Sequence, residues 1–405
     1  MSRQYSLLLL GLWVVLPPAG AATDSGGLAA AARAIVGARQ GVYVEAADGT
    51  ALVSQAAADA VHPASVSKVP TTLALLRKFG SDHRFATRFA VNGPIRDGVL
   101  EGDLFVESDG DPFFVDENAL LVAEQLRGLG IARVAGGLRT HGTLTFDWVD
   151  DQDGTHLQQV LSGHAPAAAW GTVAAIGGEL TGPVPPPVIH FGEVAGATTA
   201  APSERTLLIH KSQPLVSMAK LLNDYSNNIF KPFADAAGGA ASVQALARSV
   251  VPAEMRDEIT LGDGAGTDPA NRLSPRAAVK LLRALEQELM HEHHSLVEIL
   301  PVAGIDDGTL QKRLDGPGEA GRIVGKTGTF GDYGASALVG AISTTDRGTV
   351  YFAILNHGVP VPEARRRQDR FVRVLLARLH TRPWPYQPDP RPAVARATVQ
   401  LASGP

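Results

Sequence analysis

The chain has 405 residues, of which 45% are hydrophobic and 19% charged, and its formal net charge is −5. At roughly 100 to 200 residues per domain, this length predicts two or three domains, and the charge balance lacks the basic excess of nucleic-acid-binding proteins. The sequence contains no cysteine. This excludes disulfides, thiolate metal sites and thiol nucleophiles, so a covalent mechanism would have to use a hydroxyl, an amine, an imidazole or a carboxylate.

The N-terminus has the pattern of a secretory signal. Arg3 precedes an apolar run over 7–16, and small residues at 18–21 follow it. This order of basic, apolar and small residues predicts a signal peptide over 1–21, cleaved near Ala21. No later segment reaches the roughly 20 apolar residues that a membrane-spanning helix needs. We therefore expect export across the inner membrane, to the periplasm, with no stable membrane span after signal cleavage.

The rest of the chain mixes strand and helix patterns. Alternating residues over 41–53 with the turn Asp48-Gly49 predict a β-hairpin, and apolar residues at helical spacing predict a helix over 65–79. Pro70 falls within this helix, so we expect the helix either to begin very near Ser65 or to kink one turn later. Further patterns predict helices over 117–129, 214–224, 274–289 and 362–379, and strands over 322–328, 336–343 and 349–355.

Changes in residue pattern and composition along the sequence predict the domain organisation. Short strand-like runs and a Gly, Ala and Pro-rich stretch separate the first helix from the later ones, and we expect this part, 86–205, to be an inserted domain. The flanking parts, 28–85 and 206–382, would then form one core domain. The Pro-rich end, 383–405, predicts a disordered tail.

Ser65 and Lys68 are three residues apart at the start of the first predicted helix. That spacing places a hydroxyl and an amine on one helix face, where a lysine can activate a serine nucleophile. The same spacing recurs at Ser217 and Lys220, but in the middle of a predicted helix, where no free backbone N–H groups are available. The spacing by itself is therefore a weak signal.

Two further motifs strengthen the first copy. Ser226-Asn227-Asn228 is the only Ser-x-Asn in the chain, and Lys326-Thr327-Gly328, on a predicted strand, is the only Lys-Thr-Gly. Their order after Ser65-Val66-Ser67-Lys68 favours a serine enzyme whose site is assembled from three separate segments.

The stretch 62–68, with Thr71-Thr72-Leu73 after it, resembles the active-serine segment of one family of penicillin-binding proteins. These are the D-alanyl-D-alanine carboxypeptidase/endopeptidase proteins of low-molecular-mass class C (penicillin-binding protein 4 type). The resemblance covers 60–380 apart from 140–205. It implies an α+β fold with a β-lactamase/DD-peptidase-like transpeptidase core, in which an antiparallel sheet is flanked by helices and interrupted by the smaller inserted domain.

The resemblance also implies site residues. The implied catalytic residues are Ser65, Lys68, Ser226, Asn228 and Lys326, and the implied substrate-binding residues are Thr327, Gly328 and Thr329. Ser65 would be acylated, with Lys68 as its general base, kept neutral by burial and by the charge of Lys326. Ser226 would pass a proton to the leaving amine, and Asn228 would bind the peptide carbonyl. The strand that carries Lys326 would bind the terminal carboxylate of a D-alanyl-D-alanine stem, and backbone N–H groups of Ser65 and Thr329 would form the oxyanion hole.

One loop departs from the family pattern. The chain has Asp263-Gly264-Ala265-Gly266-Thr267-Asp268 where the family usually has Asp-Gly-Ser-Gly-Leu-Ser, so hydroxyls at two positions are absent. Substrate contacts made through those hydroxyls would be lost here.

Other polar clusters favour simpler interpretations. His291, His293 and His294 are expected to be exposed residues at a helix end, and the run 365–367 to lie on the solvated face of the last helix. The aspartates at 147, 150, 151 and 153 lack the spacing of a calcium loop and are expected to form an acidic, solvated loop. We expect no metal site and no cofactor.

The sequence thus predicts an exported serine DD-peptidase that cleaves peptidoglycan stem peptides through a Ser65 acyl-enzyme. Its expected partners are peptidoglycan peptides and β-lactams, and not nucleic acid. Two alternatives stay open: a catalytically silent peptidoglycan-binding homologue, and a serine β-lactamase. The sequence does not rank carboxypeptidase against endopeptidase action.

Overall fold

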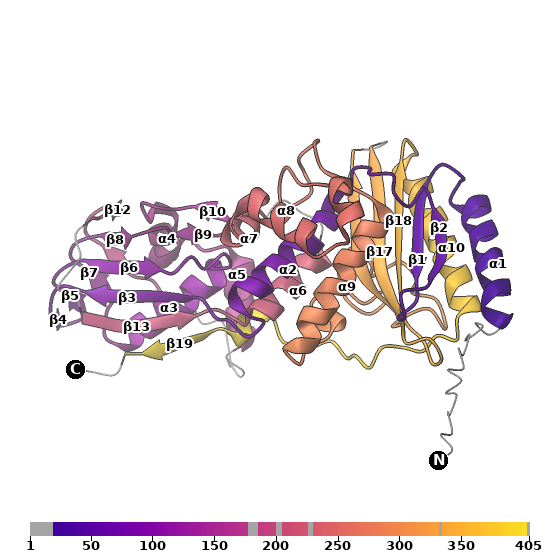
Figure 1. Cartoon of the computed structure of the whole chain (residues 1–405). Helices are drawn as coiled ribbons and strands as arrows, with labels where there is room; N and C mark the ends of the chain where they lie inside the picture. Colours follow the sequence, from indigo (N-terminus) through magenta and orange to yellow (C-terminus); the bar gives the residue numbers. More distant parts are fainter. Residues whose placement is uncertain (1–18, 177–184, 200–204, 226–229, 332–333, 403–405) are drawn as a thin grey trace, which may run out of the picture.

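The computed structural model describes residues 19–176, 185–199, 205–225, 230–331 and 334–402 (Figure 1). Arg3 and the apolar run over 7–16, on which the predicted signal rests, lie outside the described residues. Helix α1 (Ala19–Ile35) begins just before the predicted cleavage position. Across the described ranges, no helix combines the length and the apolar character needed to cross a membrane.

Five antiparallel strands form the central sheet, in the order β16-β17-β18-β1-β2. They are β1 (Gly41–Glu45), β2 (Ala51–Gln55), β16 (Ile323–Phe330), β17 (Ala335–Ser343) and β18 (Thr349–His357). β17 is buried along its whole length because helices lie on both faces of the sheet (Figure 1). The predicted hairpin and the three predicted C-terminal strands are therefore all present.

Side chains of the sheet alternate between two cores, as the two-residue period of a strand requires. Val339 and Ala341 pack with the helices α2 (Lys68–Phe79) and α9 (Pro275–His291). Leu338 and Ile342 point to the other face and pack with α1 and α10 (Val361–Arg378). The result is the antiparallel sheet flanked by helices that the sequence predicted.

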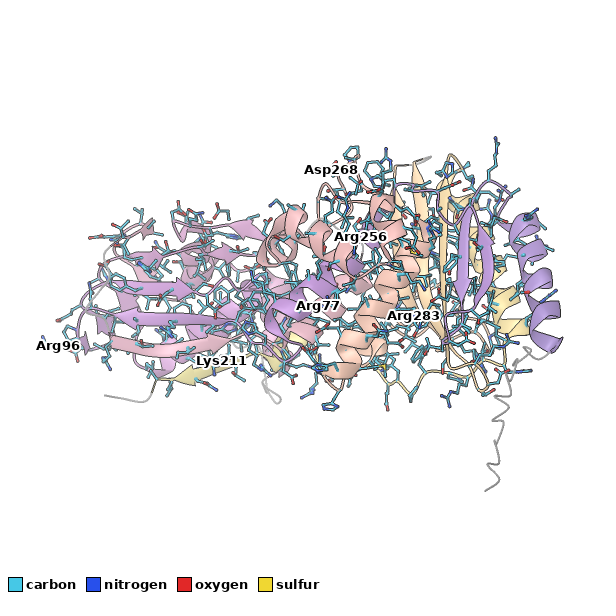
Figure 2. The ribbon with its side chains drawn as sticks, viewed as in Figure 1. Arg77, Arg96, Lys211, Arg256, Asp268 and Arg283 are labelled. Atoms are coloured by element: carbon cyan, nitrogen blue, oxygen red, sulfur yellow. The ribbon has the colours of Figure 1, made fainter. Side chains whose placement is uncertain are left out.

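Helix α9 is fixed at its start and along its length. The hydroxyl of Ser274 accepts a hydrogen bond from the backbone N–H of Ala277 at 3.1 Å, which caps the helix, and proline follows at the first helical position. Glu45 of β1 is fully buried, and its carboxylate accepts hydrogen bonds from Lys280 Nζ at 2.6 Å and from Arg283 Nη1 at 2.7 Å. Arg283 is labelled in Figure 2. Because both cations reach it, this buried carboxylate is fully paired and ties α9 to the sheet.

Pro70 lies in the first turn of α2. A 3₁₀ turn, η1 (Ala64–Ser67), precedes the helix, which begins at Lys68. In a first turn the missing N–H of proline removes no intrahelical hydrogen bond. Of the two expected outcomes, the chain adopts the start near Ser65, without a kink at Pro70.

The part predicted as an insert has sheets and a core of its own (Figure 1). A six-stranded sheet runs in the order β12-β8-β6-β3-β13-β19, and a four-stranded sheet in the order β11-β7-β5-β4. Its strands are β3 (Ala86–Val91), β4 (Ile95–Arg96), β5 (Val99–Leu100), β6 (Leu104–Ser108), β7 (Arg133–Val134), β8 (Leu138–His141), β11 (His190–Phe191), β12 (Gly196–Ala197), β13 (Arg205–Lys211) and β19 (Thr398–Leu401). The helices α3 (Asp116–Gly128), α4 (Thr155–Gln159) and α5 (Ala167–Ile176) and the hairpin of β9 (Thr145–Phe146) and β10 (Val149–Asp150) complete it.

Two boundaries of the predicted domains differ from the structure. Residues 206–211, assigned to the core domain, lie in β13 and pair with β3 of the insert. From Pro383 to Ala402, the part that the structure describes, the predicted tail is ordered: its Pro-rich part runs as an extended segment, and then β19 pairs with β13 in antiparallel register. Tyr386 anchors the extended part by donating a hydrogen bond to Asp306 Oδ1 at 2.6 Å. Prolines prevent regular structure, but these long-range contacts order the segment.

Candidate active site

Ser65 lies in the turn η1, against the edge strand β16 and the loop 263–268. Ala64, the residue before it, has a left-handed φ of +47°, a conformation that costs a residue with a side chain free energy. Two glycines allow the backbone to approach this turn. A Cβ at Gly328 would lie 3.1 Å from the Ser65 backbone nitrogen, and one at Gly266 would lie 2.1 Å from the Ala64 carbonyl oxygen. The chain therefore packs closely around the Ser65 backbone. Ser65 as a whole residue is 7% exposed.

Lys68 is fully buried beside Ser65. Its Nζ donates to Ser65 Oγ at 3.0 Å and to the carbonyl oxygen of Ala265 at 2.6 Å, and lies 5.2 Å from the ring centre of Phe230. Burial lowers the pKa of Lys68 to about 8, against the opposing effect of the Asp263 charge. An amine with this pKa is deprotonated in a substantial fraction of molecules near neutral pH, so it can accept a proton.

The loop 263–268 holds Lys68 through its backbone. Asp263 organises the loop: one carboxylate oxygen accepts from the N–H of Gly266 at 2.8 Å, and the other accepts from the N–H of Thr267 at 2.8 Å. Burial acts to raise the pKa of Asp263, but hydrogen bonds from the Thr267 hydroxyl and the Asn271 amide, and next these two N–H groups, hold it below its ordinary value. The Ala265 carbonyl contacts Lys68 without needing a side-chain hydroxyl, so the departure from the family pattern leaves this contact intact.

Lys326 is a second fully buried lysine, on β16. Burial, and next the charge of Lys68, lower its pKa to about 7, whereas Asp224 acts in the opposite direction. The next residue, Thr327, donates from its hydroxyl to Thr309 Oγ1 at 2.7 Å, and the N–H of Thr309 donates to the Asp224 carbonyl at 3.0 Å. The strand and the end of α6 (Leu215–Asp224) are thereby linked next to the lysine.

His62 supports the turn that carries Ser65. Its ring stacks on Phe330 with the ring centres 3.9 Å apart, and its Nδ1 accepts from the Ala64 N–H at 3.1 Å. With Nδ1 as acceptor, Nε2 carries the hydrogen that bonds the Asp268 carbonyl at 2.9 Å. Burial lowers the pKa of His62, which favours this neutral form.

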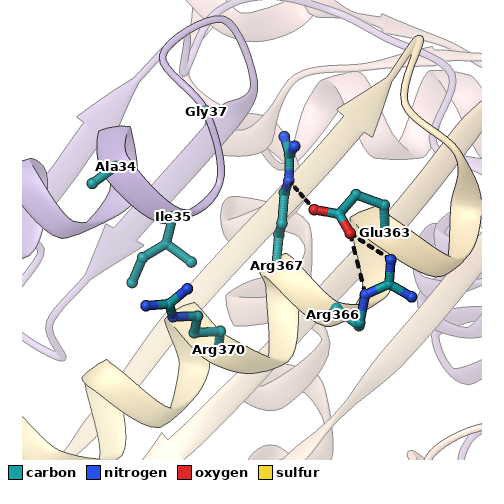
Figure 3. A pocket seen from close by; sticks show the side chains of 7 residues that line it. All are labelled: Ala34, Ile35, Gly37, Glu363, Arg366, Arg367 and Arg370. Atoms are coloured by element: carbon teal, nitrogen blue, oxygen red, sulfur yellow. Dashed lines mark hydrogen bonds and ion pairs between the residues drawn. The ribbon is translucent and has the colours of Figure 1, made fainter.

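Arg365 reaches the site from α10. Its Nη2 donates to Thr329 Oγ1 at 2.8 Å, beside Lys326 and Thr327 on the same strand. The next two arginines differ, because Arg366 and Arg367 both donate to Glu363 on their own helix, beside a cavity of about 490 Å³ between α1 and α10 (Figure 3). Of the run predicted to be solvated, Arg365 alone contacts a predicted substrate-binding residue.

The predicted site residues fall into two groups. Ser65 and Lys68 are in direct contact, and Lys326, Thr327, Gly328 and Thr329 lie on the strand beside them. Ser226 and Asn228 lie outside the described residues. The described residues on either side of that segment are at the site, since Asp224 influences the pKa of Lys326 and Phe230 lies next to Lys68.

The second Ser-x-x-Lys copy has a different environment. Ser217 Oγ accepts from Arg396 Nη1 at 2.9 Å, while Lys220 Nζ lies 2.5 Å from Asp306 Oδ2. Each group thus has its own structural partner. This agrees with the interpretation that the Ser-x-x-Lys spacing by itself is a weak signal.

Comparison with known proteins assigns the chain to a family. The model of the D-Ala-D-Ala carboxypeptidase 3 (S13) family matches residues 27–166 and 189–378. The chain belongs to this family. The resemblance seen in the sequence is therefore confirmed, and with it the assignment to a family of serine-type D-Ala-D-Ala carboxypeptidases.

One curated protein and several solved structures are similar to this chain. A D-alanyl-D-alanine carboxypeptidase of Actinomadura sp. is 33% identical over 121 residues, which is 29% of this chain but only 22% of that protein. A penicillin G-acylated predatory endopeptidase of Bdellovibrio bacteriovorus, solved with an immunity protein, has a TM-score of 0.76 at 21% identity and covers 89% of this chain and 99% of its own. Penicillin binding protein 4 of Haemophilus influenzae has a TM-score of 0.61 at 16% identity, covering 86% and 99%. These structures confirm the fold class.

Sequence reasoning missed several residues of this S13 site. Asp224, Thr309 and Arg365 contact or influence the β16 strand, and Asp263 organises the loop around Lys68. Thr309 lies within the part of the chain that the resemblance covers, 60–380, but the resemblance gave it no role. Arg365 had no sequence signal, since its spacing on α10 is that of any exposed arginine.

Proposed function

We propose that this S13 protein is an exported serine DD-peptidase that cleaves peptidoglycan stem peptides through an acyl-enzyme on Ser65. The observation that carries the proposal is the contact between Ser65 Oγ and a buried lysine amine whose pKa is lowered to about 8. Serine hydroxyls are weak nucleophiles unless a neighbouring base removes their proton. Lys68 is the base in this proposal.

In the acylation step, neutral Lys68 accepts the Ser65 hydroxyl proton while Oγ attacks the carbonyl carbon of the penultimate D-alanine. The carbonyl oxygen gains negative charge, which backbone N–H groups of Ser65 and Thr329 stabilise. The C–N bond then breaks, and the leaving amine receives a proton, with Ser226 as the proposed relay and Asn228 binding the peptide carbonyl. Water later cleaves the ester, which releases the shortened peptide and restores Ser65.

Recognition of the substrate's terminal carboxylate is assigned to β16. Lys326 supplies positive charge when protonated, and the hydroxyls of Thr327 and Thr329 are hydrogen-bond donors for a carboxylate. Arg365 adds a permanent positive charge where it contacts Thr329. A D-alanyl-D-alanine stem and the carboxylate of a β-lactam would both use this group of cations and hydroxyls.

The proposal covers both carboxypeptidase and endopeptidase action, which differ only in whether the released amine is free D-alanine or part of a cross-link. The solved Bdellovibrio relative is described as an endopeptidase and the Actinomadura relative as a carboxypeptidase. No glutamate motif for a deacylation base is recognisable in the sequence, so β-lactams are expected to give a long-lived acyl-enzyme rather than rapid turnover.

The test is intact mass after brief incubation of the mature protein with benzylpenicillin, followed over hours. The wild type should gain one penicillin adduct that persists, and Ser65→Ala should gain none. Ser217→Ala is the matched control, because Ser217 is the serine of the second Ser-x-x-Lys copy, and it should be acylated like the wild type. An adduct on Ser65→Ala would move the nucleophile elsewhere, fast loss of the adduct would favour a β-lactamase, and no adduct on the wild type would favour a silent binding protein.

A further inference from the structure

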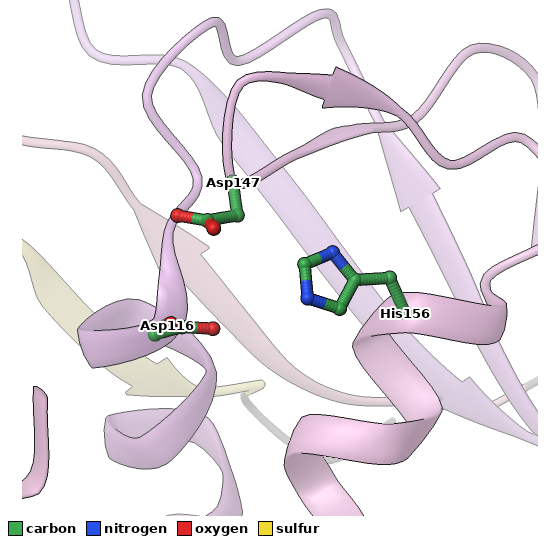
Figure 4. A group of neighbouring side chains, drawn as sticks. All are labelled: Asp116, Asp147 and His156. Atoms are coloured by element: carbon green, nitrogen blue, oxygen red, sulfur yellow. The ribbon is translucent and has the colours of Figure 1, made fainter. Parts of the chain in front are cut away.

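A second cluster of chemically active side chains lies in the insert, away from Ser65. Asp116 is the first residue of α3, Asp147 lies in the turn between β9 and β10, and His156 lies in α4. One ligand atom of each residue lies within 4.8 Å of those of the other two. Figure 4 shows the three side chains projecting from separate elements into the same space.

Asp116 is the observation that calls for an explanation. The residue is only 7% exposed, and its Oδ1 is buried without a hydrogen-bond donor among the residues that the structure describes. Burial, and next the charge of Asp147, raise the pKa of Asp116 to about 6. The side-chain hydrogen bond seen at the start of α3 is made by Asn118 and not by Asp116: Asn118 Oδ1 accepts from the Val115 N–H at 3.1 Å. A buried carboxylate without a partner is costly, and a bound cation would remove that cost.

A neighbouring aspartate shows what a purely structural role looks like. Asp151 is also buried, and its oxygens accept from the N–H groups of His156 at 3.0 Å and Leu157 at 2.9 Å. It therefore caps α4 and is not part of a solvated loop, which corrects the sequence interpretation. The cap also fixes the start of the helix that carries His156. The His156 ring packs edge-on against Phe146, with the ring centres 5.0 Å apart.

The donor set indicates the kind of metal. One imidazole nitrogen with two carboxylate oxygens suits Zn²⁺, whereas Mg²⁺ and Ca²⁺ prefer oxygen ligands alone. Tetrahedral zinc would require ligand atoms roughly 3.4 Å apart, so small side-chain rotations would close the cluster. An ion can enter, because Asp116 and Asp147 line a cavity of about 500 Å³.

We propose that Asp116, Asp147 and His156 form a Zn²⁺ site with a fourth position open to water. The ion would join the start of α3 to the β9–β10 turn. The next residue in that turn, Trp148, packs edge-on against Phe113, with the ring centres 4.5 Å apart. Phe113 is part of the hydrophobic core that includes residues of α2 and α9, and Trp148 packs against this core. Zinc would thus stabilise the junction between the insert and the rest of the chain. This departs from the expectation of no metal site.

The test is Zn²⁺ titration of the full mature chain by calorimetry, together with melting temperature in Zn²⁺ and in EDTA. The wild type should bind one Zn²⁺ at this site and melt at a higher temperature in Zn²⁺ than in EDTA. Asp116→Asn keeps the side-chain shape and removes the buried charge, so it should fold at least as well in EDTA. It and His156→Gln should weaken Zn²⁺ binding at least about tenfold, because they remove a direct ligand, and should abolish the shift in melting temperature.

Two matched controls separate this site from general surface binding. Asp150→Asn alters an exposed aspartate of β10, just after the same turn, and His294→Gln alters a histidine that contacts Glu298 elsewhere. Both should bind Zn²⁺ like the wild type. The proposal is overturned if the wild type binds no Zn²⁺, if Asp116→Asn and His156→Gln bind it unchanged, or if His294→Gln is the variant that loses it. A stabilisation by Ca²⁺ that equals that by Zn²⁺ and survives His156→Gln would likewise overturn the zinc assignment.

Discussion

Two lysines are buried beside Ser65: burial, and next the charge of Lys68, lower the pKa of Lys326, whereas burial alone lowers that of Lys68. Neither amine is exposed, and the pKa values fall to about 8 for Lys68 and about 7 for Lys326. Burial is the largest cause in both, because an ammonium group loses its hydration there. Asp263 and Asp224 oppose the shift at Lys68 and Lys326 respectively. The two carboxylates therefore limit how far each amine moves from its ordinary pKa.

A first prediction concerns Lys68 as the base. Lys68→Arg should slow acylation by benzylpenicillin by at least about 100-fold, because a guanidinium cannot accept the Ser65 proton and general-base catalysis is worth about this much. The measurement is the rate of adduct formation by mass spectrometry. Lys220→Arg, in the second Ser-x-x-Lys copy, should react at the wild-type rate. Acylation of Lys68→Arg at the wild-type rate would contradict the assignment.

The pH profile gives a second readout of the same group. Since the charged form of Lys68 is the inactive one and its pKa is about 8, the wild-type acylation rate should rise as the pH increases through about 8. Any residual rate in Lys68→Arg should lack this rise. A wild-type rate that is flat from about pH 6 to pH 9 would mean that Lys68 does not titrate in the reaction.

Arg365 is predicted to take part in carboxylate recognition through Thr329. Arg365→Ala should lower kcat/KM for a peptide ending in D-alanyl-D-alanine by about tenfold, the effect of losing one charge-assisted hydrogen bond. The same peptide with an amidated C-terminus should be affected little, because it lacks the negative charge. Arg366→Ala is the control, since Arg366 pairs with Glu363. Equal losses for the acid and the amide would assign Arg365 a purely structural role.

At the scale of elements, the loop 263–268 packs closely onto the turn η1. At position 266 there is no room for a side chain, so only glycine fits. Gly266→Ala should destabilise the protein by about 2 kcal/mol and slow acylation, because the new Cβ meets the Ala64 carbonyl and the φ of +93° disfavours alanine. Urea unfolding and penicillin adduct formation measure the two effects.

Gly110→Ala separates the two causes of that loss. Gly110 has a φ of +98° but no atom within 4 Å of its Cβ position. This variant should carry only the backbone cost, about 1 kcal/mol, and should be acylated normally. If Gly266→Ala were as active as Gly110→Ala, the close approach of the loop would not matter for catalysis.

Elements with local signals were predictable from the sequence, and long-range contacts were not. Ser274-Pro275 marked the start of α9, and Asp48-Gly49 marked the first hairpin, because caps and turns depend on a few adjacent residues. Ser65 and Lys68 were recognisable for the same reason. β19 and Arg365 were not, because each depends on a partner, β13 or Thr329, that is brought close only by the fold.

At the scale of the whole molecule, the chain links the insert and the central sheet three times (Figure 1). It passes from α2 to β3, returns from β13 to α6, and finally crosses again after α10 through the extended C-terminal segment. Arg396 stabilises this last crossing through two hydrogen bonds. Its Nη1 donates to Ser217 Oγ of α6, and its backbone carbonyl accepts from Arg84 Nη1 at 2.6 Å. The end of the chain therefore contributes to the insert's sheet although the sequence places it after the core domain.

The final prediction tests that contribution. A chain ending at Ala397 lacks β19, so β13 would keep its pairing with β3 but become an edge strand. It would lose the hydrogen bonds to β19 and the packing of Val399 against the insert's core. A loss of about 2 kcal/mol from these hydrogen bonds and this packing would lower the melting temperature of the insert by roughly 4–8 °C. Scanning calorimetry measures the shift, and size-exclusion chromatography measures association through the exposed edge. A chain ending at Ala402 retains β19 and should melt like the full chain. Because Ser65 and Lys68 do not contact β19, benzylpenicillin should acylate both truncated chains at the wild-type rate; an unchanged thermogram for the shorter chain would show that β19 adds nothing to stability.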